Sequence, residues 1–349
     1  MDLISNLPAE LKLSIVEILN PDDCFNCAII TKDFWQLCEP VVNKHKALIA
    51  KYGYVCTEPE ENTLWNLLND VLDKPYLSQY VKEVQLDSER GDLYYTSLRN
   101  FDLIESASLG PPAKDVVRYI SAAENIPYLC EPSNENQAHH DAQERNELIE
   151  KGAVDPIMAI VLTLLPNLKV LRFVPVGDGF WFLNAIKRAA ATYGLSNPNP
   201  NTPFQHLRKV QVSHYDTEMS MDWEWAHFFV RLPSLQWCTG HMLGGMANSL
   251  QNDESLQPVV TPTSNVTRFQ LSYSNLDSEV VAAILSNFKN LQFFEYENGG
   301  NVVSDAWYDS RKMIAALLQY CSHSLERLVL EDDNHLRVSE FKLSRELSC

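Results

Sequence analysis

A short pattern of apolar residues, apolar-x-x-apolar-x-apolar, recurs along most of this chain. It starts at seven places: Val81, Leu168, Leu207, Leu235, Val266, Leu291 and Leu325. Successive starts are 87, 39, 28, 31, 25 and 34 residues apart. After the first gap, these intervals are typical of proteins in which one supersecondary unit repeats and stacks on its neighbours. The pattern therefore predicts a series of short strands, one in each unit.

Helical periodicity fills most of the intervals between these predicted strands. Apolar residues recur three and four positions apart over 64–72, 156–165, 180–193, 221–231, 278–288 and 310–320. A helix, a turn and a strand repeated in one order build a parallel sheet with helices outside it. A doubly wound sheet shows the same alternation, but its strands are longer and wholly apolar. We therefore expect an α/β fold in the form of an irregular, curved solenoid.

The first 52 residues read as a small all-helical module ahead of this repeat. Asn20 and Pro21 end a first helix and start a second one. A third helix begins near Lys32, and Pro40 is expected to interrupt it before a last helix that reaches Tyr52.

Apolar residues of the first helix fall on one stripe, which consists of Leu7, Leu11, Ile15, Ile18 and Leu19. So small a helical unit cannot bury all of this surface by itself. The remaining apolar surface needs a partner, which is either the rest of this chain or another protein. Spacing alone leaves open whether the module caps the larger domain or docks elsewhere.

Several residues of the module form a set with defined spacing. They are Leu7-Pro8-x-Glu10-Leu11, Ile15, Leu19, Pro21-x-Asp23 and Thr31-Lys32-x-Phe34-Trp35. Over roughly residues 5–50, this set resembles an F-box of the form common in fungal proteins. Cys24 departs from the pattern, because Leu is usual there, and so does Asp33, where a basic residue is frequent.

The resemblance implies docking on the small Skp adaptor of a Skp/Cullin/F-box ubiquitin ligase. The residues that it implies for this contact or its support are Leu7, Pro8, Glu10, Leu11, Ile15, Leu19, Cys24, Phe34 and Trp35.

Recurrent phrases downstream, such as Leu165-Pro166-Asn167-Leu168 and Leu232-Pro233-Ser234-Leu235, join helix to strand. Over most of residues 60–335 they resemble the leucine-rich-repeat half of fungal F-box proteins. Two domains are therefore expected, an F-box-like module over 1–52 and a leucine-rich-repeat-like solenoid over 53–349. The resemblance implies a non-catalytic subunit that recruits a protein target for ubiquitin transfer, acting through the adaptor and a cullin.

Side chains alternate along a strand, so the x positions of the pattern should share the concave face of the solenoid. Arg and aromatic side chains are the usual anchors of protein interfaces, and a row of Arg suits an acidic or phosphorylated peptide. The same charges would also simply solvate a concave sheet and pair with neighbouring Glu. The candidate target-binding residues are Arg172, Lys209, Trp237, Arg268, Phe293 and Arg327.

The long first gap contains a polar, acidic insertion at about 88–154. It reads as a helix over 113–125 and then as a surface insertion or a partly ordered linker, because its second half is poor in apolar residues. Two groups of residues are of types that bind metals: Cys130, His139, His140 and Asp141 within the insertion, and the Cys24-x-x-Cys27 pair. A structural site needs four well-placed ligands, and no second pair follows the two cysteines. Adjacent histidines in a polar helix are usually only solvated, so we expect no metal at either place.

Motifs for catalysis are missing from the sequence. It has no phosphate-binding Gly-rich loop, nucleophile elbow, kinase signature or H-E-x-x-H helix. We therefore expect no enzyme and no cofactor. The alternative to a ligase subunit is a leucine-rich-repeat scaffold or inhibitor unrelated to ubiquitin, with the N-terminal helices acting as a cap on the solenoid.

The charge of the chain limits its partners. A formal net charge of −18 and a pI near 4.9 argue against nucleic-acid and anionic-membrane binding, which need clustered Lys and Arg. No secretory signal or membrane-length apolar segment is visible, so the eight cysteines are expected to be reduced thiols of a cytosolic or nuclear protein.

Overall fold

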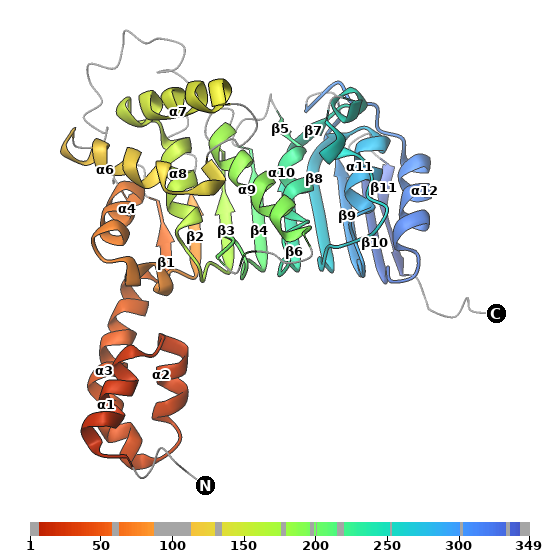
Figure 1. Cartoon of the computed structure of the whole chain (residues 1–349). Helices are drawn as coiled ribbons and strands as arrows, with labels where there is room; N and C mark the ends of the chain where they lie inside the picture. Colours follow the sequence, from red (N-terminus) through yellow and green to blue (C-terminus); the bar gives the residue numbers. More distant parts are fainter. Residues whose placement is uncertain are drawn as a thin grey trace.

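The N-terminal helices build a module with a core of its own (Figure 1). In the computed structural model, which describes residues 7–57, 63–86, 113–129, 135–175, 179–195, 199, 201–214, 220–251, 253–300, 303–332 and 336–342, these helices are α1 Ala9–Ile18, α2 Pro21–Ala28 and α3 Lys32–Tyr52. Their common core consists of Val16, Cys24, Ala28, Phe34, Cys38 and Val42. Asn20 caps α2 by accepting a hydrogen bond from the Asp23 N–H at 2.8 Å.

Helix α3 runs without a break through Pro40, so the predicted interruption at this residue is wrong. Pro40 lies on the exposed side of the helix, where its ring meets solvent. Both halves of α3 are held by packing, the first in the module core and the second against the sheet, where Tyr52 is buried. Tertiary packing at both ends therefore outweighs the helix-breaking effect of proline.

The larger part of the chain forms one sheet whose strands follow each other in the order β1-β2-β3-β4-β6-β8-β9-β10-β11. Every strand pair that the structure describes is parallel except β10–β11. The strands are β1 Tyr54–Cys56, β2 Glu83–Leu86, β3 Val170–Phe173, β4 Lys209–Ser213, β6 Trp237–His241, β8 Arg268–Leu276, β9 Phe293–Asn298, β10 Arg327–Asp332 and β11 Leu336–Lys342. Each of the seven sequence patterns lies at one of these strands, from β2 to β10, which confirms an α/β fold with a parallel sheet.

Helices follow one another along the sheet (Figure 1). They are α4 Thr63–Asp73, α6 Ala113–Glu124, α7 Glu135–Glu150, α8 Val154–Thr163, α9 Phe180–Tyr193, α10 Glu224–Phe229, α11 Ser278–Leu285 and α12 Ser310–Cys321, with short 3₁₀ turns η1 Pro75–Tyr80, η4 Pro127–Leu129, η5 Ala247–Gln251 and η6 Glu254–Leu256. Along the strands, buried and half-buried residues alternate. The helices therefore cover one face of the sheet and leave the other accessible.

The segment expected to be helical over 221–231 is partly a strand. Met221–Asp222 forms β5, which pairs with β7 Leu243–Gly245, and α10 begins only at Glu224. The Met221 N–H donates to the Met242 carbonyl at 2.9 Å, and the Trp223 N–H donates to the Gly244 carbonyl at 3.1 Å. These long-range hydrogen bonds, which helical periodicity cannot reveal, set the start of the helix.

Within the described part of the insertion at 88–154, both segments are helical. Arg145 of α7 is fully buried although it is charged, and its guanidinium donates to the Leu129 carbonyl at 3.3 Å. Ile149 of the same helix belongs to the main core. A buried Arg and one apolar anchor thus order a helix that the composition alone describes as polar.

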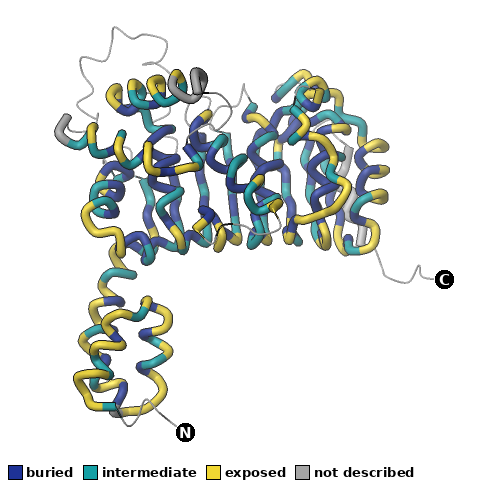
Figure 2. Tube along the Cα trace, viewed as in Figure 1, coloured by how far each residue is buried: buried dark blue, intermediate teal, exposed yellow. Residues whose placement is uncertain are grey.

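Burial separates the two parts of the molecule (Figure 2). The N-terminal module is mostly exposed around its small core, whereas the main core runs the length of the sheet. Where they meet, His45 Nδ1 lies 2.6 Å from the Tyr80 hydroxyl, and the Tyr52 hydroxyl donates to Asp70 at 2.7 Å. Among the helices that the structure describes, none combines the length and the apolar character needed to cross a bilayer.

Candidate protein-interaction surfaces

Helix α1 turns most of its apolar residues toward solvent. Leu11 is 53% exposed and Ile18 is 83% exposed, and Ile15 lies beside them. Only Val16 of this helix is buried in the module core. The apolar face of α1 is therefore not used by the rest of the described chain, and we call Leu11, Ile15 and Ile18 the α1 apolar face.

Other residues of the module enlarge this apolar surface. Ile29 and Ile30, in the connection between α2 and α3, and Trp35 on α3 are exposed as well. Sequence reasoning missed the two isoleucines. The available signal was two consecutive large apolar residues in a helix connection, where polar residues are usual.

The remaining candidate adaptor residues divide between the surface and the core. Pro8 and Glu10 are exposed, and Leu7 and Leu19 are half-buried. Cys24 and Phe34 are buried in the module core, and burial raises the pKa of the Cys24 thiol. The departure from the family pattern at Cys24 thus changes the interior of the module, not its exposed face. The side chain of Asp33 lies outside the described part of the chain.

Five candidate target-binding residues form a single line across the uncovered face of the sheet. The strand register aligns Lys209 with Trp237, Trp237 with Arg268, Arg268 with Phe293, and Phe293 with Arg327. Each of the five is the first residue of its strand. Together they make the cation–aromatic row, which consists of Lys209, Trp237, Arg268, Phe293 and Arg327.

Cations and aromatic rings alternate along this row and touch. Lys209 Nζ lies 3.7 Å from the Trp237 ring centroid, and the Arg268 guanidinium lies 4.6 Å from the same ring. Arg268 also lies 4.6 Å from the Phe293 ring, and Arg327 lies 5.1 Å from it. These distances are within the range of attractive cation–π contacts. Partial burial and the nearby Arg172 lower the pKa of Lys209.

The sixth candidate, Arg172, lies in a neighbouring line and is already paired. It aligns with Gln85 and Gln211, and it forms an ion pair with Glu83. Gln270 and Glu295 lie in the same neighbouring line: Trp237 Nε1 of the row donates to Gln270 at 2.8 Å, and Gln270 donates to Glu295 at 2.6 Å. These hydrogen bonds hold the Trp237 ring of the row from the side, a supporting role that sequence reasoning did not assign.

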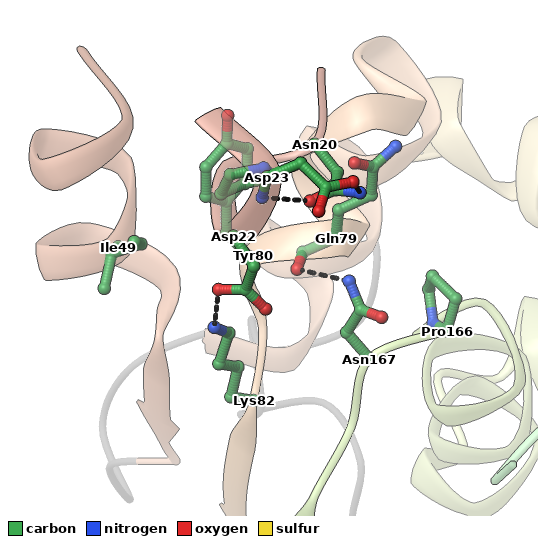
Figure 3. A pocket seen from close by; sticks show the side chains of 10 residues that line it. Asn20, Asp22, Asp23, Ile49, Gln79, Tyr80, Lys82, Pro166 and Asn167 are labelled. Carbon is green, nitrogen blue, oxygen red and sulfur yellow. Dashed lines mark hydrogen bonds and ion pairs between the residues drawn. The ribbon is translucent and has the colours of Figure 1, made fainter. Parts of the chain in front are cut away.

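A polar cleft of about 470 Å³ separates α2 from the end of the sheet (Figure 3). Lys82 Nζ bridges it to Asp22 at 3.1 Å, and Asn167 donates to the Gln79 carbonyl at 2.9 Å. The lining is completed by Asn20, Pro21, Asp23, Ile49, Tyr80 and Pro166. The cleft thus lies at the contact between the N-terminal module and the larger part of the chain.

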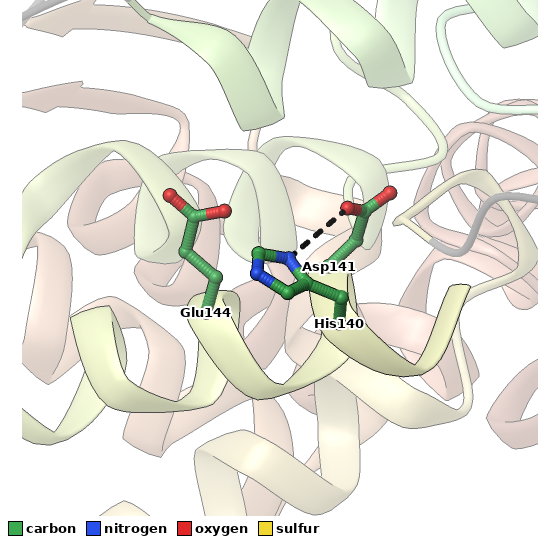
Figure 4. Close-up of side chains that lie close together, drawn as sticks. All are labelled: His140, Asp141 and Glu144. Atoms are coloured by element: carbon green, nitrogen blue, oxygen red, sulfur yellow. Dashed lines mark ion pairs between the residues drawn. The ribbon is translucent and has the colours of Figure 1, made fainter. Parts of the chain in front are cut away.

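One group of possible metal ligands lies on α7 (Figure 4). His140, Asp141 and Glu144 bring ligand atoms within 4.8 Å of one another. His140 and Glu144 are exposed, and all three come from one face of a polar helix. Cys130 and the side chain of His139 lie outside the described part of the chain. The three side chains thus come from a single helix, and His140 and Glu144 are solvated.

Cysteines do not supply such a site in the part of the chain that the structure describes. Cys24, Cys27, Cys38, Cys56, Cys238 and Cys321 are free thiols. Burial raises the pKa of Cys238 and of Cys321 to about 12, so both remain protonated and unreactive at neutral pH.

The two surfaces lie on different parts of the molecule, one on the N-terminal module and one on the sheet. No protein family and no curated protein matches the sequence. Function is therefore inferred from the α1 apolar face and the cation–aromatic row.

Proposed function

We propose that this chain is a non-catalytic, substrate-recruiting subunit of a Skp/Cullin/F-box ubiquitin ligase. The N-terminal helices act as the F-box and dock on the Skp adaptor, and through it on the cullin. The sheet with its helices is a leucine-rich-repeat solenoid that holds a protein target. The complex works in the cytosol or nucleus.

The exposed α1 apolar face is the observation that carries this proposal. Leu11, Ile15 and Ile18 lie on a module that already has its own core, so they are not needed to hold it together. An unpartnered apolar helix face of this kind is typical of a helix that binds another protein.

The separation of the two surfaces supports the same function. A recruiting subunit forms or breaks no covalent bond, and its contribution is proximity between a bound target and a ubiquitin carrier. That role requires two independent binding surfaces held at a fixed distance, which α3 provides by joining the module to the sheet.

Co-purification with a Skp adaptor tests the proposal. The unmodified chain is expected to co-purify with a co-expressed adaptor. The double variant Leu11→Asp/Ile15→Asp is expected to lower recovery by at least about tenfold, because it places two charges in an apolar interface. Both residues are exposed, so the variant is expected to keep the helical circular dichroism of the unmodified chain.

A matched control adds the same charge elsewhere. Val117 on α6 and Leu318 on α12 are exposed apolar residues far from the module in sequence. The double variant Val117→Asp/Leu318→Asp is expected to co-purify as the unmodified chain does. Failure of the unmodified chain to bind any adaptor, under conditions where known F-box proteins bind, would favour the scaffold or inhibitor alternative.

A further inference from the structure

We propose that the cation–aromatic row binds an extended acidic segment in which anionic side chains recur at every third residue. This inference rests on the proposed function in taking the ligand to be part of a protein target. It goes further by naming the chemistry and spacing of that ligand.

Two cations of the row, Lys209 and Arg268, form no ion pair within the described part of the chain. Among the residues that the structure describes, no carboxylate lies within 4.0 Å of Lys209 or of Arg268. By contrast, Lys187, Arg118 and Lys312 all form ion pairs with carboxylates. In a chain with a net charge of −18, two cations of one row, Lys209 and Arg268, that form no ion pair with a described carboxylate indicate a site for an external anion.

Nearby carboxylates are already engaged by other groups. Glu83, which aligns with the row at its β2 end, is paired with Arg172. Glu295, in the neighbouring line, accepts the hydrogen bond from Gln270. Neither carboxylate therefore neutralises Arg268, whose contacts are the two aromatic rings.

The strand order sets the spacing of the cations. Lys209, Arg268 and Arg327 lie on β4, β8 and β10, and one strand separates each from the next. Neighbouring strands are about 5 Å apart, so the Cα atoms of successive cations are about 10 Å apart. Contacts with the shared rings bring the charged groups closer, to no more than about 8 Å for Lys209 and Arg268 and about 10 Å for Arg268 and Arg327. A polyproline II segment rises about 3.1 Å per residue with three residues per turn. Its side chains at i, i+3 and i+6 therefore point the same way about 9 Å apart and match the row.

The same contacts disfavour single-stranded nucleic acid as the ligand. Bases bind such proteins by stacking on free aromatic faces. Here Lys209 and Arg268 lie over the Trp237 ring, and Arg268 and Arg327 lie over the Phe293 ring. The rings hold the cations in place instead, which reduces the entropy lost when an anion binds.

Peptide binding to the full-length chain, followed by fluorescence anisotropy, tests the inference. The periodic probe is a labelled peptide with Glu at i, i+3 and i+6 and Pro and Ser between them. Its control has the same composition with the three Glu adjacent. The periodic peptide is expected to bind at least about tenfold more tightly. Equal affinity for the two peptides, or binding of neither, would overturn the inference.

Two further probes identify the source of the anion. A peptide with phosphoserine at the same three positions distinguishes phosphate from carboxylate, and tighter binding of either periodic peptide supports the row as its site. An oligouridine of similar length is expected to bind more weakly than both. Preferential binding of the oligouridine would contradict a peptide site.

Arg268→Gln is the decisive variant, with Arg311→Gln as its matched control. Arg268 lies in the centre of the row, whereas Arg311 is an exposed residue at the start of α12. Arg268→Gln is expected to weaken the periodic peptide by about tenfold or more, and Arg311→Gln to leave it unchanged. Equal effects of the two variants would contradict the assignment.

The ligase function and the peptide-binding inference can be contradicted independently of each other. Arg268→Gln is expected to co-purify with the Skp adaptor as well as the unmodified chain does, because Arg268 is far from α1. Adaptor binding without any peptide binding would overturn only this inference. Peptide binding without adaptor binding would overturn only the ligase function.

Discussion

Single buried polar residues decide how this fold responds to pH. His227 on α10 is fully buried, and its Nε2 lies 3.0 Å from the Ser255 carbonyl oxygen. Its Nδ1 is buried without a partner among the described residues. Burial, followed by the nearby Arg231, lowers the pKa of His227 to about 3. The folded protein therefore excludes a proton that the unfolded chain accepts.

This difference predicts a loss of stability in acid. As the pH falls below about 6.5, the unfolded chain binds a proton at His227 and the folded chain does not, until about pH 3. Between pH 7 and pH 5 the free energy of unfolding falls by about 2 kcal/mol from this residue. Urea unfolding of the unmodified chain and of His227→Gln at both pH values measures it, as a change in the difference between the two proteins.

The comparison with a variant is needed because Glu224 acts in the opposite direction. Burial, followed by Asp222, raises the pKa of Glu224 to about 6, so protonation near pH 5 stabilises the folded chain. That contribution is common to both proteins and cancels in the difference. A difference that stays constant from pH 7 to pH 5 would show that His227 titrates normally.

At the scale of elements, the sequence predicts what local patterning determines. Alternation predicts that Lys209 and Trp237 lie on one face of the sheet. The pattern that starts at Leu235 has its last position at Gly240 and predicts that this residue lies in a strand. The structure confirms both predictions. Glycine fits there because an added Cβ would lie 2.6 Å from Leu243 Cδ1. The pairing of β5 with β7 and the burial of Arg145 depend on contacts with distant residues, so spacing could not reveal them.

The same limit applies to the candidate surfaces. Helical spacing placed Leu11 and Ile15 on one stripe, but Val16 is the residue of α1 that fills the core. Likewise, the sequence names Arg172 and Arg268 as equivalent candidates. The structure distinguishes them, because Arg172 forms an ion pair with Glu83 whereas Arg268 lies over aromatic rings. Residue type and spacing thus name the candidates, whereas the contacts that each of them makes depend on the fold.

Helix α3 provides a prediction at this scale. Pro40 cannot donate a backbone hydrogen bond inside the helix, so Pro40→Ala is expected to stabilise the N-terminal module by about 1–3 kcal/mol. Hydrogen exchange of the α1 and α2 amides measures the change. Glu39→Ala, at the exposed neighbouring position, is expected to change stability by less than about 0.5 kcal/mol. A less stable Pro40→Ala would mean that proline acts mainly by restricting the unfolded chain.

At the scale of the whole molecule, two separate cores imply two levels of stability. The module core contains six buried residues, Val16, Cys24, Ala28, Phe34, Cys38 and Val42, and the main core shares none of them. A core this small contributes little stability. The predicted division of the chain into two domains can therefore be tested as a difference in local opening.

Hydrogen exchange of the full-length chain is expected to resolve this difference. Amides of α1 and α2 should exchange at least about a hundredfold faster than those of β6 and β8 in the middle of the sheet. Addition of a Skp adaptor should slow exchange in α1 and leave β6 unchanged. Equal protection of α1 and β8 in the free chain would mean that the module and the sheet open as one unit.

The unbroken helix α3 has a consequence for the direction in which the two surfaces face. Its 21 residues form a helix about 31 Å long, which starts in the module core and ends at the sheet. Each residue added to such a helix lengthens it by about 1.5 Å but turns everything beyond it by about 100°. Under the proposed function, the number of residues in α3 therefore sets the rotational phase between adaptor and target. Which lysines of a bound target can receive ubiquitin would then depend on this angle more than on distance.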